Sequence, residues 1–310
     1  MIQSVRNKYK HTEKKVLKPF ISALVILVSF CLISSCQNDT TERISDSSDA
    51  YNEMLLDSNQ AVVYTVPTPV QITSALKLLD IKYSDEFIQE TKNNKTSYVS
   101  TFSKAINLGI HLVDLTYVVI YDNSQASLIY FDKIEKLTRE LDLQNNRTIP
   151  VLTKCKKFIT NKDSLFYTLL TLQNEMDRKL FESQKEEVSL IIIAGFYIEG
   201  LYMLTNHYEK LMKNKTFTSF YSNNLNNIIF QQKLYLESLL DLLKMYPDED
   251  IQKLNASLVK LQKQFEELNI RYEFSDKEQR LKNVTFDKDK LVEIKNFVSS
   301  FRSSIVNDTY

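Results

Sequence analysis

Glycine and tryptophan are the residues that this chain most clearly lacks: its 310 residues include three glycines and no tryptophan. Average usage is roughly 7% glycine. Hairpins with primed turns, dinucleotide-binding fingerprints and phosphate-cradling loops need glycine where the backbone takes a positive φ angle or approaches a phosphate. The scarcity of glycine argues against all of these features, and helical periodicity is the pattern that remains.

Cysteine is also scarce, with Cys31, Cys36 and Cys155 the three in the chain. Cys31 and Cys36 lie in the N-terminal segment described next, which leaves Cys155 as the free thiol of the remaining chain. An intramolecular disulfide and a cysteine zinc site are therefore excluded. The sequence contains no H-x-x-x-H or E-x-x-H spacing. We accordingly expect neither a metal nor a cofactor.

The N-terminal segment carries the most specific signal in the sequence. Six basic residues and one acid precede an apolar run of 14 residues from Phe20 to Ile33. A membrane-spanning helix needs about 20 apolar residues, whereas the apolar part of a signal peptide needs about 7 to 15. The run ends in Ile33-Ser34-Ser35-Cys36, which resembles the lipobox of bacterial lipoproteins.

The lipobox resemblance implies that residues 1–35 are removed and that Cys36 is acylated, a palmitate-type modification. Several acyl chains make an effective anchor, since each buried CH₂ contributes about 0.8 kcal/mol and one chain binds only marginally. The alternative is an uncleaved short transmembrane segment. We expect a cell-envelope lipoprotein held in the outer membrane bilayer through Cys36, either on the periplasmic face or at the cell surface.

Residues 36–60 are predicted to form an acidic tether, because they hold six acids and one base. Without residues 1–35 the chain has 33 basic and 38 acidic residues, a net charge of about −5. Segments of this kind are solvated and self-repelling. The negative charge and the scattered lysines argue against nucleic-acid binding. Residues 61–310 remain for one folded domain.

Helical periodicity runs through residues 61–310 and predicts an all-α domain, a single bundle of about eight to ten helices. Thr68 as N-cap and Pro69 in the first turn predict the start of the first helix. Ser124, Asp163 and Asp248 are predicted caps of later helices. The predicted helices cover residues 69–79, 96–121, 125–142, 151–159, 164–183, 187–212, 218–246, 249–271 and 288–306. Residues 272–287 show no helical stripe and are expected to form an arm that docks the last helix.

The predicted helix 249–271 carries an apolar seam with alternating steps of three and four residues. Its members are Ile251, Leu254, Leu258, Leu261, Phe265 and Leu268. We expect this seam to pack on helix 218–246 within the same bundle. A seam between two copies of the chain is the alternative, and the sequence leaves the oligomeric state open.

Two predicted helices are unusually apolar, and each carries a narrow polar stripe. Asn107, His111 and Asp114 share one face of the first helix, and Glu199 and Tyr202 share one face of the second. If these faces meet, they form a buried polar cluster in which carboxyl pKa values rise and His111 can hold a proton between two acids. The cluster is then either a ligand or proton-transfer pocket or a satisfied network that fixes helix register.

All three glycines lie inside these two helices. A glycine inside a helix costs about 1 kcal/mol relative to alanine. We expect Gly109 and Gly200 to offset this cost at close helix crossings. Gly195 is expected to leave room for a neighbouring side chain.

Three segments together resemble a family of all-helical lipoproteins from Bacteroidetes: VYTVPTPVQITSALKLL, TSYVSTFSKAINLGIHLVDLTYVVIYD and IIAGFYIEGLYML. The matching positions are Tyr64, Val66, Pro67, Thr68, Pro69, Ala105, Asn107, Leu108, Gly109, Asp114, Leu115, Gly195, Ile198, Glu199, Gly200, Leu201 and Tyr202. The acids that follow Cys36 also resemble the surface-export signal of such lipoproteins. The resemblance implies a helical fold and an envelope location, and it implies no activity.

The sequence therefore predicts a lipid-anchored binding or scaffold protein that acts on an envelope protein partner. No residue is predicted to be catalytic, and an enzyme is the less favoured reading. One alternative is an enzyme or small-ligand pocket that uses the buried polar cluster. Another is a nutrient-capture lipoprotein paired with an outer-membrane transporter.

Overall fold

Helices make up most of the described chain. The computed structural model describes residues 69–88, 98–213, 217–275 and 280–310, and within these ranges it has nine α-helices, one short 3₁₀ helix and one two-stranded sheet. The α-helices are α3 (Pro69–Leu78), α4 (Thr101–Ile120), α5 (Ser124–Glu140), α6 (Thr148–Lys157), α7 (Lys162–Glu182), α8 (Glu186–Lys213), α9 (Ser219–Leu243), α10 (Glu249–Glu267) and α11 (Lys288–Val306). The predicted all-α bundle is confirmed.

The predictions for the N-terminal part of the chain concern residues that are not described. They comprise the signal peptide, the acylated Cys36, the acidic tether and the Thr68 N-cap. The described residues all belong to one compact unit, residues 53–310. The first described helix, α3, begins at Pro69, as the sequence predicts.

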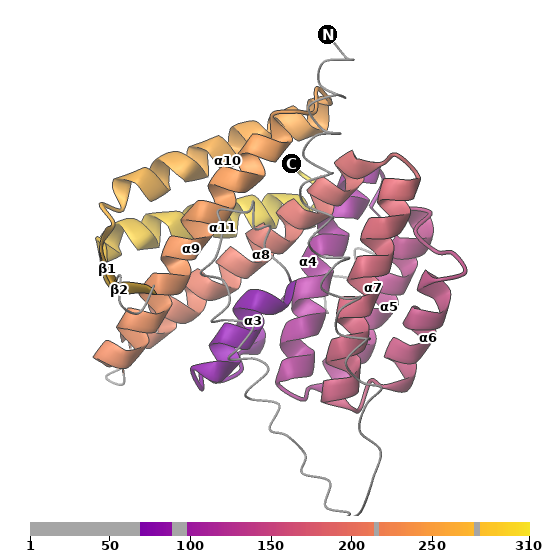
Figure 1. Cartoon of the computed structure of the whole chain (residues 1–310), viewed down its shortest axis with the longest axis horizontal. Coiled ribbons are helices and arrows are strands. Elements are labelled where there is room, and N and C mark those ends of the chain that lie inside the picture. Colours follow the sequence, from indigo (N-terminus) through magenta and orange to yellow (C-terminus); the bar gives the residue numbers. More distant parts are fainter. Residues whose placement is uncertain (1–68, 89–97, 214–216, 276–279) are drawn as a thin grey trace, which may run out of the picture. The chain divides into compact units, whose positions relative to one another are not determined.

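Helices α4 and α8 form the centre of this unit (Figure 1). Helices α3, α5, α7 and α11 contact α4, and helices α3, α7, α9 and α11 contact α8. Every residue of α4 from Ala105 to Ile120 is buried. Both helices are long and apolar enough to cross a membrane, but most of each is buried among its neighbours. Their apolar character is therefore accounted for by their place in the core.

The two central helices touch backbone to backbone where Gly109 meets Gly195. A Cβ atom on Gly109 would lie 2.1 Å from the carbonyl oxygen of Ile192, and a Cβ atom on Gly195 would lie 2.3 Å from that of Ile106. The close crossing predicted at Gly109 is confirmed. The expectation for Gly195 is wrong, because the α4 backbone rather than a side chain fills the space above it.

The N-cap residues of α5, α7 and α10 lie at or within two residues of the predicted positions. Asp248 caps α10, as predicted. Asn123 rather than Ser124 caps α5, and Asn161 rather than Asp163 caps α7. In each case the asparagine side chain accepts a hydrogen bond from a backbone N–H three residues on, which is the ordinary N-cap interaction.

The seam on α10 is buried within the chain. Each of its six residues is at most 1% exposed, and α10 contacts α9 and α11. The seam therefore packs inside the bundle, as expected, and the described helix ends at Glu267 rather than at residue 271.

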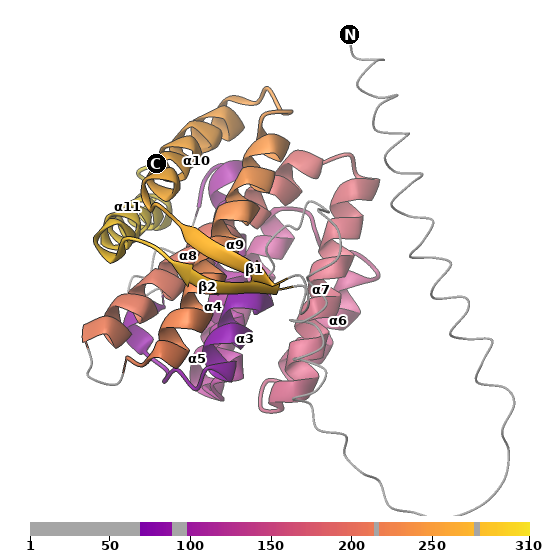
Figure 2. The same cartoon turned by 60° about the vertical axis from the view of Figure 1, so that its left-hand side comes forward.

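Within the arm expected at residues 272–287, the structure has two β-strands that the sequence did not predict. Strands β1 (Arg271–Ser275) and β2 (Arg280–Thr285) pair antiparallel, and β2 packs on α9 (Figure 2). The register shifts near Asn283, whose φ is 52°, as in a bulge. The alternation of polar and aromatic residues in RYEFS is the sequence signal for β1.

Candidate functional site

The structure brings three of the five predicted polar residues together between α4 and α8. Asp114 of α4 and Glu199 of α8 are fully buried, and Asp114 lies close enough to Glu199 to oppose the ionisation of its carboxyl group. Nδ1 of His111 lies 3.6 Å from Oδ2 of Asp114. From here on, the term buried polar cluster refers to His111, Asp114 and Glu199 together with Arg302, which is described next.

Arg302 of α11 completes the cluster, although the sequence does not single it out. Its Nε donates to Oε2 of Glu199, and its Nη2 donates to Oε1 at 2.9 Å. The guanidinium carbon lies 4.3 Å from the ring centroid of Tyr202. Glu199 is therefore held by a bidentate, charge-assisted pair that is stacked on an aromatic ring.

A sequence signal for Arg302 does exist. It occupies the buried face of α11 between Val298 and Ile305 and is only 8% exposed. An arginine at an apolar-stripe position needs a carboxylate partner, because an unpaired buried charge is strongly unfavourable. The partner, Glu199, is 103 positions away, which helical periodicity alone does not identify.

The other two predicted residues play smaller parts. Nδ2 of Asn107 donates to the carbonyl of Ser103 at 2.9 Å, one turn earlier on its own helix. Tyr202 is partly buried and offers its ring face to Arg302. The contacts of both residues are with other groups than Asp114 and Glu199, so the candidate site consists of Asp114, Glu199 and Arg302, with His111 beside them.

Burial sets the protonation of the cluster. It raises the pKa of Glu199 to about 8; Arg302 opposes this rise and Asp114 adds to it. Two carboxyl groups face one guanidinium, so the acidic pair retains a proton at neutral pH. Burial, together with nearby Lys133, lowers the pKa of His111 to about 3. His111 is therefore neutral, and the expectation that it holds a proton between two acids is wrong.

A second buried network lies nearby and is not anticipated from the sequence. The Tyr117 hydroxyl of α4 lies 3.0 Å from Nε2 of His207 of α8 and accepts a hydrogen bond from the Ser84 N–H at 2.8 Å. Phe87 packs edge-on against the imidazole, with 4.7 Å between ring centroids. Burial, with a smaller effect from Lys210, lowers the pKa of His207 to about 4. This network is a neutral link between the core helices and residues 84–87.

These pKa shifts predict how stability depends on pH. From pH 4.5 to about 8 the folded chain holds the Glu199 proton more tightly than the unfolded chain does, so stability falls as pH rises. Below pH 6.5 the unfolded chain protonates His111 and His207 and the folded chain does not, so stability rises with pH there. We expect the highest thermal midpoint near pH 6.5, where the histidine contributions end.

The pH prediction is checked by thermal unfolding on both sides of this maximum, with wild type and Glu199→Gln. The variant should lose the decline between pH 6.5 and about 8, because the group that titrates there is gone. A wild-type midpoint that keeps rising up to pH 8 would contradict the assignment.

Neither a metal site nor a reactive thiol is evident in the part of the chain that the structure describes. Residues 69–88, 98–213, 217–275 and 280–310 contain no group of three or more His, Cys, Asp or Glu side chains that could hold a metal. Cys155 is buried, and burial raises the pKa of its thiol to about 12. The thiol is therefore protonated and unreactive at neutral pH.

The surface offers a different kind of site, a groove of about 440 Å³ between α9, α10 and β1. The rings of Phe230 and Tyr272 lie 5.1 Å apart along it. Leu234 and Tyr272 are about half exposed, and Glu266 and Asn269 supply polar groups at the rim. Exposed apolar side chains beside polar groups are typical of binding surfaces.

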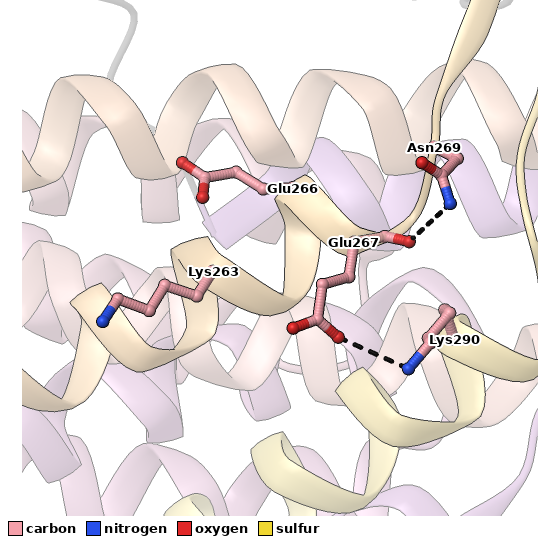
Figure 3. Close-up of a pocket in the computed structure, with 5 residues that line it drawn as sticks. All are labelled: Lys263, Glu266, Glu267, Asn269 and Lys290. Carbon is pink, nitrogen blue, oxygen red and sulfur yellow. Dashed lines mark hydrogen bonds and ion pairs between the residues drawn. The ribbon is translucent and has the colours of Figure 1, made fainter.

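A second, charged hollow adjoins this groove and shares Glu266 and Asn269 with it. Figure 3 shows Glu267 and Lys290 pointing toward each other between α10 and α11, with 3.4 Å between Nζ and Oε2. Asn269 donates to the Glu267 carbonyl at 3.2 Å. Since Glu267 and Lys290 pair with each other, the charged hollow is the weaker candidate, and the aromatic groove is the stronger.

Comparison of the chain with protein-family models, with curated proteins and with solved structures finds no match.

Proposed function

We propose that this chain is a lipoprotein anchored in the outer membrane through acylated Cys36, related to the Bacteroidetes lipoproteins that its motifs resemble. Its helical domain acts as a binding or scaffold module for another envelope component. The lipobox at Cys36 and the acidic residues that follow it support the anchor. The arrangement of polar side chains in the domain supports a surface role over catalysis.

The pairing of Glu199 with Arg302 is the observation that supports a surface role of the domain over catalysis. Both of its carboxylate oxygens accept hydrogen bonds from Arg302, and its neighbour Asp114 is fully buried. A catalytic acid, base or nucleophile must reach a reacting atom of the substrate. The Glu199 carboxyl lies between Arg302 and Asp114 and is oriented for packing. His111 is neutral and only 1% exposed, so it cannot act as the catalytic acid or base in its place.

The aromatic groove is the contact surface that this function would use. Phe230, Leu234 and Tyr272 expose apolar area beside Lys233 and Glu266. Aromatic anchors surrounded by polar groups are the usual centres of protein interfaces. The groove lies outside the buried polar cluster, so binding there leaves the core unchanged.

The anchor predicts a simple labelling result. Cys36→Ser should abolish incorporation of labelled palmitate and move the protein from the membrane fraction, because the thiol that carries the lipid is missing. Cys31→Ser is the matched control, since this cysteine lies in the segment that is removed. Palmitate labelling and membrane fractionation of wild type and both variants give the answer.

Equal palmitate labelling of wild type and Cys36→Ser would contradict the proposed anchor. A wild-type mature chain whose first residue, by mass spectrometry, is not Cys36 would contradict it equally.

A further inference from the structure

Helix α6 and its flanks form an acid-free, basic segment on the surface. Residues 143–162 contain Arg147, Lys154, Lys156, Lys157 and Lys162 and no acid. The three lysines at the end of α6 are exposed. Outside this segment the acylated chain would carry 28 basic and 38 acidic residues. The segment therefore carries five positive charges and no negative charge, whereas the rest of the acylated chain is net negative.

Among the described residues, the three α6 lysines also lack acidic partners. Among the described residues, Lys154, Lys156 and Lys157 make no ion pair. A longer acid-free stretch, residues 210–236, differs, because its described lysines each contact a glutamate. Since the charges on α6 are not neutralised within the described chain, they are available to an external anion.

Exposed apolar side chains accompany these lysines. Tyr167 and Phe181 of α7 are 55% and 60% exposed, and Ile149 of α6 is 49% exposed. Nη1 of Arg147 lies 2.8 Å from Oε1 of Glu182, which holds the start of α6 against the end of α7. Helix α6 packs on α5 and α7 at the edge of the bundle, which leaves its other side uncovered by described helices (Figure 1).

We propose that the exposed side of α6, called the basic face, docks the domain on an anionic lipid bilayer together with the exposed Tyr167 and Phe181 of α7. Lysines are attracted to anionic headgroups within about a Debye length, roughly 8 Å at physiological salt. Tyrosine and phenylalanine favour the interface between headgroups and acyl chains. Because the α6 lysines belong to an acid-free segment of a net negative molecule, an anionic surface attracts this side of the domain.

This inference rests on the proposed anchor at Cys36. The 32 residues between Cys36 and Pro69 can span no more than about 110 Å even when fully extended. An anchored domain is therefore confined near the bilayer at a high effective concentration. A surface with low affinity for the bilayer is then sufficient for docking. Docking on α6 and α7 leaves the aromatic groove, which lies on α9, α10 and β1, free for a partner.

The test uses the chain that begins at Gln37, which keeps every described residue and lacks the acylated cysteine. Its binding to phosphatidylcholine vesicles with and without phosphatidylglycerol is measured by sedimentation at low and high salt. We expect at least roughly tenfold tighter binding to the anionic vesicles, weakened by salt. Lys154→Glu/Lys157→Glu should remove this preference.

Lys260→Glu/Lys263→Glu is the matched control, because these exposed lysines of α10 have the same spacing and change the net charge equally. It should keep the preference for anionic vesicles within about twofold. Equal thermal midpoints of the two variants establish that both are folded.

The docking proposal would be overturned if wild type bound neutral and anionic vesicles equally. It would also be overturned if the two double variants lost equal amounts of binding to anionic vesicles. An acidic peptide that binds through Lys154 and Lys157 when vesicles do not would overturn it as well, since that result would assign the face to a protein partner. Palmitate labelling of the full chain separates the two proposals. If the full chain is labelled but the chain from Gln37 does not bind vesicles, the acylated anchor is supported and docking through the basic face is contradicted. If the full chain is not labelled but the chain from Gln37 binds anionic vesicles, docking is supported and the anchor is contradicted.

Discussion

Replacing Arg302 with methionine is expected to lower the free energy of unfolding at neutral pH by about 3–5 kcal/mol, the usual cost of removing one partner of a buried ion pair. Arg302 donates two hydrogen bonds to the fully buried Glu199, and its charge is also attracted by the nearby, fully buried Asp114. Without it, both acids must be protonated or remain charged in a medium of low dielectric constant. Methionine retains the volume and the helix propensity, so the loss reports the missing guanidinium.

Arg178→Met is the matched control for this measurement. Arg178 pairs with Glu175 three residues earlier on α7, and the arginine side chain is about half exposed. An exposed pair of this kind contributes about 0–1 kcal/mol. Urea unfolding of wild type and both variants, followed by circular dichroism, compares them directly. A loss for Arg302→Met no larger than that for Arg178→Met would show that the cluster contributes little to the fold.

Alanine at Gly109 or Gly195 is expected to cost about 3 kcal/mol or more, the upper end of the range for overpacking a core. At both positions the new Cβ atom would meet a backbone carbonyl oxygen of the other central helix. Neither helix can move without disturbing the side chains that surround α4 and α8. The gain in helix propensity, about 1 kcal/mol, is too small to offset this.

Gly200→Ala is the internal control for the helix crossing. Its new Cβ atom would lie 2.8 Å from Cδ1 of Ile72, the end of a flexible side chain that can rotate away. We expect a stability within about 1 kcal/mol of wild type, since the gain in helix propensity offsets the adjustment. Denaturant unfolding of the three glycine variants gives the comparison. A cost at Gly200 equal to that at Gly109 would mean that helix packing there is no looser than at the crossing.

The bundle could be predicted from the sequence because helix formation depends on local properties. Apolar periodicity, capping chemistry and the scarcity of glycine all act within a few turns, and they locate all nine described helices within several residues. The narrow polar stripes noted in the sequence on α4 and α8 agree with the place of both helices in the centre of the bundle. The hairpin was missed because its short strands lie between helices and β1 shows its alternation over only five residues.

The site could be predicted only in part, because its chemistry depends on residues far apart in the chain. The facing of Asp114 and Glu199 follows from the polar stripes on two core helices. Arg302 arrives from the last helix, and its identity as the partner of Glu199 is a tertiary fact. The neutral state of His111 likewise depends on complete burial, which a stripe of polar residues does not specify.

The same physical reasoning separates the interior from the surface as places for function. Two interior groups are held by side chains of other helices: Glu199 by Arg302, and Tyr117 by His207. The surface carries the exposed lysines of α6, which make no ion pair among the described residues, and the rings of the aromatic groove. An anchored domain with this arrangement is suited to contacts with a bilayer and with a partner.

One measurement tests the central claim, that the buried polar cluster serves the fold and the function lies at the surface. The thermal midpoint of the chain from Gln37 is measured as wild type, Glu199→Gln and Tyr272→Ala, with and without a library of small metabolites and glycans. We predict that any compound that raises the wild-type midpoint raises that of Glu199→Gln equally, and that a groove ligand fails with Tyr272→Ala. A compound that stabilises wild type but not Glu199→Gln would show that Glu199 binds a ligand, and it would contradict the claim.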